Sequence, residues 1–240
     1  MAGSTGPDII QDGLVLALDA ANTKSYPGSG TTIYNTIDLN QSGTLTNGVL
    51  YNSTNIPYLQ GDGTDAYIEI DSVKDSINET GKVTISAWVY INSSDEGCYV
   101  ASMGSNSTNE YRYFKVGNIG SYVGESMGFI AGLEMRMYYT GGEELLVGSW
   151  NYVTATLSGN NNMYVNGVVV PPEQIDFDRG TSTTTFTIST GGFNIFRRRY
   201  QPSVDTHYDN GQLAILHVHN RHLTPKEILQ NYNQTKSRFL

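Results

Sequence analysis

Short runs of β-favouring residues follow one another along this 240-residue chain, and turn residues separate them. The run Val83–Ile91 shows the pattern most clearly, because apolar residues alternate with polar or aromatic ones at a period of two. Asn166 and Gly167 stand between two other apolar runs, and this dipeptide is the strongest short-range signal for a hairpin. Many short strands with Gly and Asn turns predict an all-β sandwich or jelly roll.

The expected strands run close together along the chain. They are Leu14–Asp19, Ala66–Ile70, Val83–Ile91, Cys98–Met103, Tyr111–Val116, Met127–Ala131, Glu134–Tyr139, Tyr152–Leu157, Met163–Val165, Val168–Val170, Thr184–Ile188, Phe193–Phe196 and Gln212–Val218. Residues 22–55 are rich in turn formers and hold only short apolar runs. One helix is expected from about Pro225 to Tyr232, since Thr224 and Glu227 have the spacing of a capping box in front of it.

The length of the chain is compatible with one domain, because β-sandwiches commonly reach this size undivided. We expect a single jelly-roll domain over residues 12–240 and a flexible arm of small, polar residues over residues 1–11. Ile9 and Ile10 are apolar residues of this arm, and we expect them to anchor it to a partner. Binding to a lattice or as a homo-oligomer would strengthen such an attachment through avidity.

The charge of the chain restricts its partners. The formal net charge is −9, which opposes non-specific binding to nucleic acid or to an anionic membrane. No stretch is long and apolar enough to predict a membrane span, and the first residues lack the pattern of a secretory signal. Cys98 is the single cysteine, so an intrachain disulfide is excluded.

Five segments in order resemble the laminin G-like, concanavalin A-like jelly-roll family. They are DGLVLALDAAN, GDGTDAYIEI, VTISAWVYI, SWNYVTATLSGNNNMYVNGVVV and GQLAILHVHNRHLTPKEILQNYN. The resemblance implies a concanavalin A-like jelly-roll sandwich of two antiparallel sheets with one short C-terminal helix. It also implies that Trp88 and Trp150 are core residues.

The segments DGLVLALDAANTKSYPGSGTT and ILQNYNQTKSRFL resemble jelly-roll domains in structural proteins of tailed bacteriophages. This resemblance implies a non-enzymatic protein on the virion surface, made in the host cytoplasm, as a capsid decoration or an appendage or fibre component. The implied partners are other virion proteins and host surface glycans. A carbohydrate-binding adhesin that acts outside a virion is the alternative, and a glycoside hydrolase is a third interpretation.

The family's frequent ligand is Ca²⁺, which requires hard oxygen ligands. Asp62 and Asp65 are the matching carboxylates, in a glycine-rich turn. Ala214 and Ile215 stand where relatives often carry an acidic pair, so the second half of such a site is missing. The competing interpretation is that both aspartates cap a tight turn and that the protein needs no cofactor.

His217, His219 and His222 are the candidates for a transition-metal site, because residues two apart on a strand share one face. No carboxylate or cysteine joins them nearby, so an aromatic packing role is the competing interpretation.

Arg197, Arg198, Arg199 and Tyr200 form the dense basic run of an acidic chain. Guanidinium groups suit a sulfated or carboxylated glycan or an acidic patch on a neighbouring subunit. Pairing with acidic residues of the chain itself is the alternative.

Retaining glycoside hydrolysis needs two carboxylates roughly 5–5.5 Å apart on one groove. Glu69 and Asp71 alternate, but no third acid completes a hydrolase motif. The string from Glu173 to Asp178 follows two prolines and is expected in a loop. The sequence therefore predicts that the protein is not an enzyme.

Overall fold

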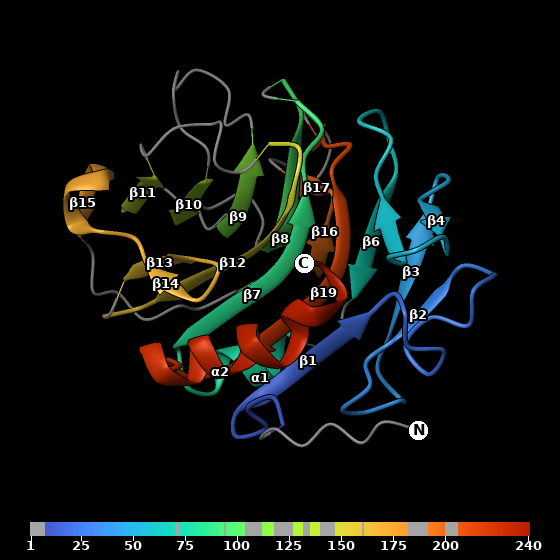
Figure 1. Cartoon of the computed structure of the whole chain (residues 1–240), viewed down its shortest axis with the longest axis horizontal. Helices are drawn as coiled ribbons and strands as arrows, with labels where there is room; N and C mark the ends of the chain where they lie inside the picture. Colours follow the sequence, from blue (N-terminus) through green and yellow to red (C-terminus); the bar gives the residue numbers. More distant parts are fainter. Residues whose placement is uncertain are drawn as a thin grey trace.

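The computed structural model describes residues 8–70, 73–93, 95–103, 112–117, 127–131, 135–139, 147–159, 161–181, 192–199 and 206–240. Two antiparallel sheets pack face to face, with a helix across the outside of one of them (Figure 1). The expected all-β sandwich of two antiparallel sheets is confirmed.

The eight-stranded sheet has the order β14-β13-β12-β7-β19-β5-β4, and β1 pairs with a further part of β19. Its strands are β1 (Leu14–Asp19), β4 (Leu50–Asn52), β5 (Tyr58–Gln60), β7 (Val83–Tyr90), β12 (Trp150–Leu157), β13 (Asn162–Val165), β14 (Val168–Val169) and β19 (Gln212–His219).

The nine-stranded sheet has the order β15-β11-β10-β9-β8-β16-β6-β3-β2. Its strands are β2 (Thr32–Tyr34), β3 (Ser42–Thr46), β6 (Tyr67–Ile70), β8 (Gly97–Met103), β9 (Arg112–Gly117), β10 (Met127–Ala131), β11 (Met135–Tyr139), β15 (Ile175–Thr181) and β16 (Phe193–Ile195). A separate hairpin joins β17 (Arg197–Arg199) to β18 (Thr206–Tyr208).

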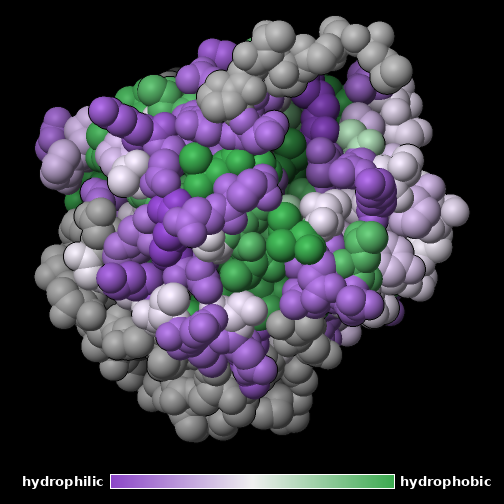
Figure 2. Space-filling view, turned by 90° about the horizontal axis from the view of Figure 1, so that it is seen from below, coloured by the Kyte–Doolittle hydropathy of each residue, from purple (hydrophilic) through white to green (hydrophobic). Residues whose placement is uncertain are grey.

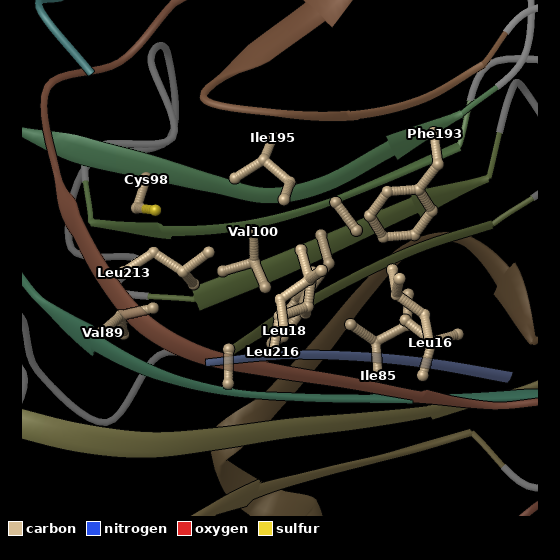
Figure 3. Packing of buried hydrophobic residues seen from close by; sticks show 14 of the residues in the cluster. Leu16, Leu18, Ile85, Val89, Cys98, Val100, Phe193, Ile195, Leu213 and Leu216 are labelled. Carbon is tan, nitrogen blue, oxygen red and sulfur yellow. The ribbon is translucent and has the colours of Figure 1, made fainter. Parts of the chain in front are cut away.

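The main core lies between the two sheets, as Figure 3 shows. Leu18, Ile85 and Leu216 come from the eight-stranded sheet, and Val100 and Ile195 face them from the nine-stranded sheet. The period of two in the sequence produces this arrangement, because alternate residues of each strand point to the same face. Burial of this apolar surface is the main favourable contribution to folding.

The hairpin between β13 and β14 is confirmed, with φ of 51° at Asn166 and 80° at Gly167. A type I′ turn requires positive φ at both central residues, and Asn and Gly tolerate that region best.

The helix α2 (Pro225–Thr235) covers the outer face of the eight-stranded sheet and continues into a short 3-10 turn, η4 (Lys236–Arg238) (Figure 1). The capping box between Thr224 and Glu227 is confirmed, and the helix is longer than expected. A second helix, α1 (Lys74–Asn78), was not predicted, because five residues are too few to show a helical period.

Trp88 lies beneath α2. Its ring stacks on Phe239 with centroids 4.0 Å apart, and its Nε1–H donates to Thr235 Oγ1 at 2.7 Å. Trp88 is fully buried, as expected, but Trp150 is only partly buried at the edge of the same cluster. The position of Trp150 therefore corrects the expectation that both tryptophans are core residues.

One loop expectation is wrong. The string from Glu173 to Asp178 enters the 3-10 turn η3 (Pro172–Gln174) and then β15, because pairing with β11 extends the chain there. The turn-rich residues 22–55 contain β2, β3 and β4. Polar strand residues at a sheet edge weaken the alternation that sequence analysis detects. The expected strand Thr184–Ile188 lies outside the described residues.

Residues 8–11, the last part of the expected arm, lie against the domain. Ile10 N–H donates to Asn231 Oδ1 at 2.8 Å, and Gln230 Nε2 donates to the Asp8 carbonyl at 2.7 Å. Ile10 also packs against the Trp88 cluster, so this part of the segment is not a free arm.

Figure 2 shows the molecule from below, with hydrophobic residues gathered at the centre between hydrophilic side chains. Of the helices in the described ranges, none has the length and apolar character needed to cross a membrane.

Candidate binding face

The outer face of the nine-stranded sheet carries polar and aromatic side chains. In β6, Ile68 and Ile70 point into the core, which leaves Tyr67 and Glu69 on the outer side. The β17–β18 hairpin contacts β8 and β16 of this sheet. We call the combined surface the tyrosine–arginine face and define it by Tyr67, Glu69, Tyr99, Tyr113, Lys115, Asn194, Arg197, Arg198, Tyr208 and Asp209.

Arg197 is the buried centre of this face. Its guanidinium carbon lies 3.4 Å from the centroid of the Tyr67 ring, and its NH2 group forms an ion pair with Glu69 Oε2 at 3.2 Å. The same NH2 group donates to Asn194 Oδ1. Only 6% of Arg197 is exposed, so its charge is used within the face, as the internal-pairing interpretation holds.

Arg198 is half-buried, and its NH1 group donates to the Tyr113 hydroxyl at 3.3 Å. The guanidinium carbon also lies 5.2 Å from the centroid of that ring. Arg199 ends β17, and its side chain and the whole of Tyr200 lie outside the described residues. The structure therefore brings two of the four predicted residues onto one face.

A second ion pair lies next to Arg198. Lys115 Nζ is 3.0 Å from Asp209 Oδ1 and 4.5 Å from the centroid of the Tyr99 ring. Desolvation raises the pKa of Asp209 to about 6, although the charge of Lys115 acts in the opposite direction. Burial, with a smaller contribution from the Asp209 charge, also raises the pKa of the Cys98 thiol well above its usual value, which disfavours the thiolate.

Phe196 joins the end of β16 to the start of β17, where the two arginines lie. Its φ is 64°, which is unusual for a bulky residue and costs on the order of 1–3 kcal/mol. Backbone hydrogen bonds hold it, because its N–H donates to the Tyr99 carbonyl at 2.8 Å and its carbonyl accepts from Asp209 N–H at 2.9 Å. Phe196 is thus held between Tyr99 of β8 and Asp209, which is a member of the second ion pair.

The accessible part of the face includes Tyr67, Tyr208, Arg198 and the carboxylate of Glu69. The two half-buried rings are tilted, with centroids 6.3 Å apart, and the Glu69 side chain is 28% exposed. Aromatic surface beside a carboxylate and a guanidinium can stack on an apolar ligand face and bond to its hydroxyl groups.

Sequence reasoning did not single out the other residues of this face, which are Tyr67, Tyr99, Tyr113, Lys115, Asn194, Tyr208 and Asp209. The alternation in β9 carried a usable signal, because Tyr113 and Lys115 alternate with two core residues. Asp209 had no local signal, since its partner Lys115 lies far away in the sequence.

The aspartates proposed for calcium lie in a tight turn. Asp62 Oδ1 accepts hydrogen bonds from the N–H groups of Thr64, Asp65 and Ala66 at 2.8, 3.0 and 2.9 Å. Desolvation opposes the effect, but these N–H groups lower the pKa of the Asp62 carboxyl. Ala214 and Ile215 are buried apolar residues and supply no second carboxylate. The arrangement fits the turn-capping interpretation for Asp62.

The three histidines do not converge. His219 lies near Ile10, with Nε2 2.9 Å from its carbonyl oxygen, while His222 Nε2 lies 2.6 Å from the Leu157 carbonyl oxygen. His217 makes neither contact and lines a separate pocket. The described part of the chain contains no group of three or more His, Cys, Asp or Glu side chains arranged to hold a metal ion.

The candidate acids give no catalytic pair within the described residues. Glu69 pairs with Arg197, and Asp71 lies outside the described residues. Asp176 and Asp178 are on β15 at the edge of the sheet, with their side chains outside the description.

Solved structures with a similar fold include binding proteins and an enzyme. The binding domain of botulinum neurotoxin DC in complex with rat synaptotagmin II has a TM-score of 0.64 and 14% identity, over 92% of this chain and 51% of that one. Botulinum neurotoxin type C, described with cell entry dependent on two ganglioside molecules, gives 0.64 and 15% over the same shares. Trypanosoma rangeli sialidase in complex with the inhibitor DANA gives 0.62 and 13%, over 95% of this chain and 34% of the enzyme.

This chain thus spans about half the length of the neurotoxin structures and about a third of the sialidase, and the low identities show a shared fold. No curated protein matches the sequence. A sequence profile described as the concanavalin A-like lectin/glucanases superfamily matches residues 62–229, which is more than half of the chain. The chain therefore belongs to the concanavalin A-like lectin/glucanase superfamily.

Proposed function

We propose that this protein is a non-enzymatic, lectin-like binding domain that holds a glycan on the tyrosine–arginine face. The observation that carries the proposal is the pair of half-buried rings, Tyr67 and Tyr208, beside the Arg197–Glu69 ion pair. Aromatic rings offer an apolar surface at low entropic cost, and the charged groups can hydrogen-bond to sugar hydroxyls or to a carboxylate.

The roles of the residues follow from their burial. Tyr67 and Tyr208 form the stacking surface, and Arg198 and Glu69 provide polar contacts at its edge. Arg197 is a positioning residue, because it stacks on one face of Tyr67 and fixes the Glu69 carboxylate.

We place this binding domain on the virion surface of a tailed phage, as a capsid decoration or an appendage or fibre component. The support is the resemblance of two segments, at residues 12–32 and 228–240, to phage structural proteins. Host glycans and neighbouring virion proteins are then its partners, after synthesis in the host cytoplasm. The adhesin alternative shares the glycan site and differs only in where the protein is found.

The glycan site can be tested with a glycan array and purified full-length protein. We expect binding to at least one glycan class, and we expect Tyr208→Ala to weaken it about tenfold or more. Tyr90→Ala is the matched control, because Tyr90 is another half-buried tyrosine but belongs to the eight-stranded sheet. An array without binding, or equal loss in both variants, would overturn the proposed site.

The location can be tested on purified particles. We expect the protein in their mass spectra and antibody labels at regular positions on the particle surface in micrographs. A protein absent from particles but able to bind glycans would favour the adhesin alternative.

A further inference from the structure

A pocket of about 290 Å³ lies where the N-terminal segment crosses the eight-stranded sheet. Its walls come from that segment, from β1, from the turn after β1, from the residues after β2 and from β19. The lining residues are Ile9, Gln11, Asp19, Asn22, Ile37 and His217, with Ala17, Leu18 and Thr36 between them. The tyrosine–arginine face lies on the nine-stranded sheet and the β17–β18 hairpin and shares no residue with this pocket, so the pocket is separate from the proposed glycan site.

His217 is the buried polar group of this pocket. Leu216 and Val218 point into the main core, so His217 faces the outer side, where it is 5% exposed and lines the pocket. Its Nδ1 is buried without a hydrogen-bond partner among the described residues. A buried polar atom without a partner is rare in native proteins and calls for an explanation such as a ligand or a water molecule.

The imidazole of His217 is neutral at ordinary pH. Desolvation lowers its pKa to about 3, and the nearby positive charge of Arg238 acts in the same direction. A neutral imidazole has one hydrogen-bond donor and one acceptor, so it can bond to a group that both accepts and donates.

The pocket as a whole has little net charge. Asp19 is its acidic residue, and both carboxylate oxygens accept from Arg238 NH1 at 2.8 and 3.0 Å. Asp19 Oδ1 also accepts from Ala21 N–H at 2.8 Å. Asn22 and Gln11 add neutral polar groups at the exposed edge, and Ile9 and Ile37 add apolar surface.

We propose that this pocket binds one neutral monosaccharide unit. Hydroxyl groups both donate and accept, which matches the imidazole and the amide groups, while the apolar wall can receive the C–H face of a sugar ring. A cationic or anionic ligand would enter without a free counter-charge, because Asp19 and Arg238 already neutralise each other. The volume is near the lower end of ligand pockets, which start at roughly 300 Å³, and suits one ring better than an oligosaccharide.

The test uses the full-length protein and NMR of its histidine rings. The chain has only four histidines, so the His217 ring signals can be assigned by comparison with His217→Gln. Glucose, galactose and N-acetylglucosamine at millimolar concentrations are the neutral probes, and glucuronate is the anionic probe. We expect at least one neutral probe to shift the His217 signals in a saturable way and glucuronate to bind more weakly.

Gln11→Trp should block the pocket from its exposed edge and weaken binding about tenfold. Lys24→Trp is the matched control, because Lys24 is exposed and does not line the pocket. Tyr208→Ala should leave the sugar-dependent His217 shifts unchanged. The binding proposed for the tyrosine–arginine face and the binding proposed for this pocket can therefore be refuted separately. The proposal is overturned if no neutral probe shifts His217, if Gln11→Trp binds as the wild type does, or if glucuronate binds more tightly.

Discussion

The outer faces of the two sheets differ in what covers them. On the eight-stranded sheet, α2 and Phe239 seal an aromatic cluster around Trp88, which makes one hydrogen bond to Thr235. On the nine-stranded sheet, the tyrosine–arginine face holds two ion pairs, and buried charges of this kind add little net stability. The comparison indicates that the first face stabilises the domain, and it is consistent with the binding role proposed for the second.

Trp88→Ala should have the largest effect on stability. It removes a buried ring from beneath α2 and leaves a cavity, which typically costs about 3–5 kcal/mol. Urea unfolding measures this loss. Tyr208→Ala on the tyrosine–arginine face should cost much less, because that ring is only half-buried. Equal losses in the two variants would mean that both faces are structural.

Deletion of residues 1–10 should lower the free energy of unfolding by about 1–3 kcal/mol. The truncation removes the carbonyl of Ile10, which lies 2.9 Å from Nε2 of the buried His219, and the N–H that reaches Asn231. Deletion of residues 1–7 is the control, since it retains both contacts. If the two truncated proteins were equally stable, residues 8–10 would not help to hold α2 on the sheet.

Acidification should destabilise the eight-stranded side. Desolvation lowers the pKa of His217 to about 3 and that of His219 to about 4, so between these values and about 6.5 the unfolded chain binds more protons than the native protein. Stability therefore falls as the pH falls, by about 1.4 kcal/mol per pH unit for each histidine. Urea unfolding over a pH series measures the slope.

Asp209 on the tyrosine–arginine face changes the stability with pH in the opposite direction. Its pKa is raised to about 6, so the native protein binds the extra proton and gains stability as the pH falls from 6 towards 4. His219→Gln should therefore flatten the acid loss, and Asp209→Asn should steepen it. A reversal of these two effects would contradict the assignment of the titrating groups.

Thr224→Ala should have the smallest effect, about 0.5–2 kcal/mol, through loss of the capping box of α2. Thermal unfolding measures it. Thr224→Ser should retain most of the stability, and Lys226→Ala is the control at a nearby exposed position. A loss confined to Lys226→Ala would show that the cap does not support the helix.

The sequence predicted the fold better than the binding face, for a physical reason. Alternation in Val83–Ile91, the Asn166-Gly167 turn and the Thr224–Glu227 cap are local patterns, and each produced the expected structure. The binding face depends on pairs such as Lys115–Asp209, which only the folded sheet brings together. Asp62 shows the reverse case, because a residue typical of a metal site is used to cap a turn.

The most direct test of the division between the two faces is amide chemical-shift mapping of the full-length protein with a glycan selected from the array. We predict that the saturable shifts belong to Tyr67, Glu69, Arg198 and Tyr208 and their neighbours, while residues of α2 stay unperturbed. Shifts concentrated on α2 or at the Asp62 turn, with the tyrosine–arginine face unchanged, would contradict the account.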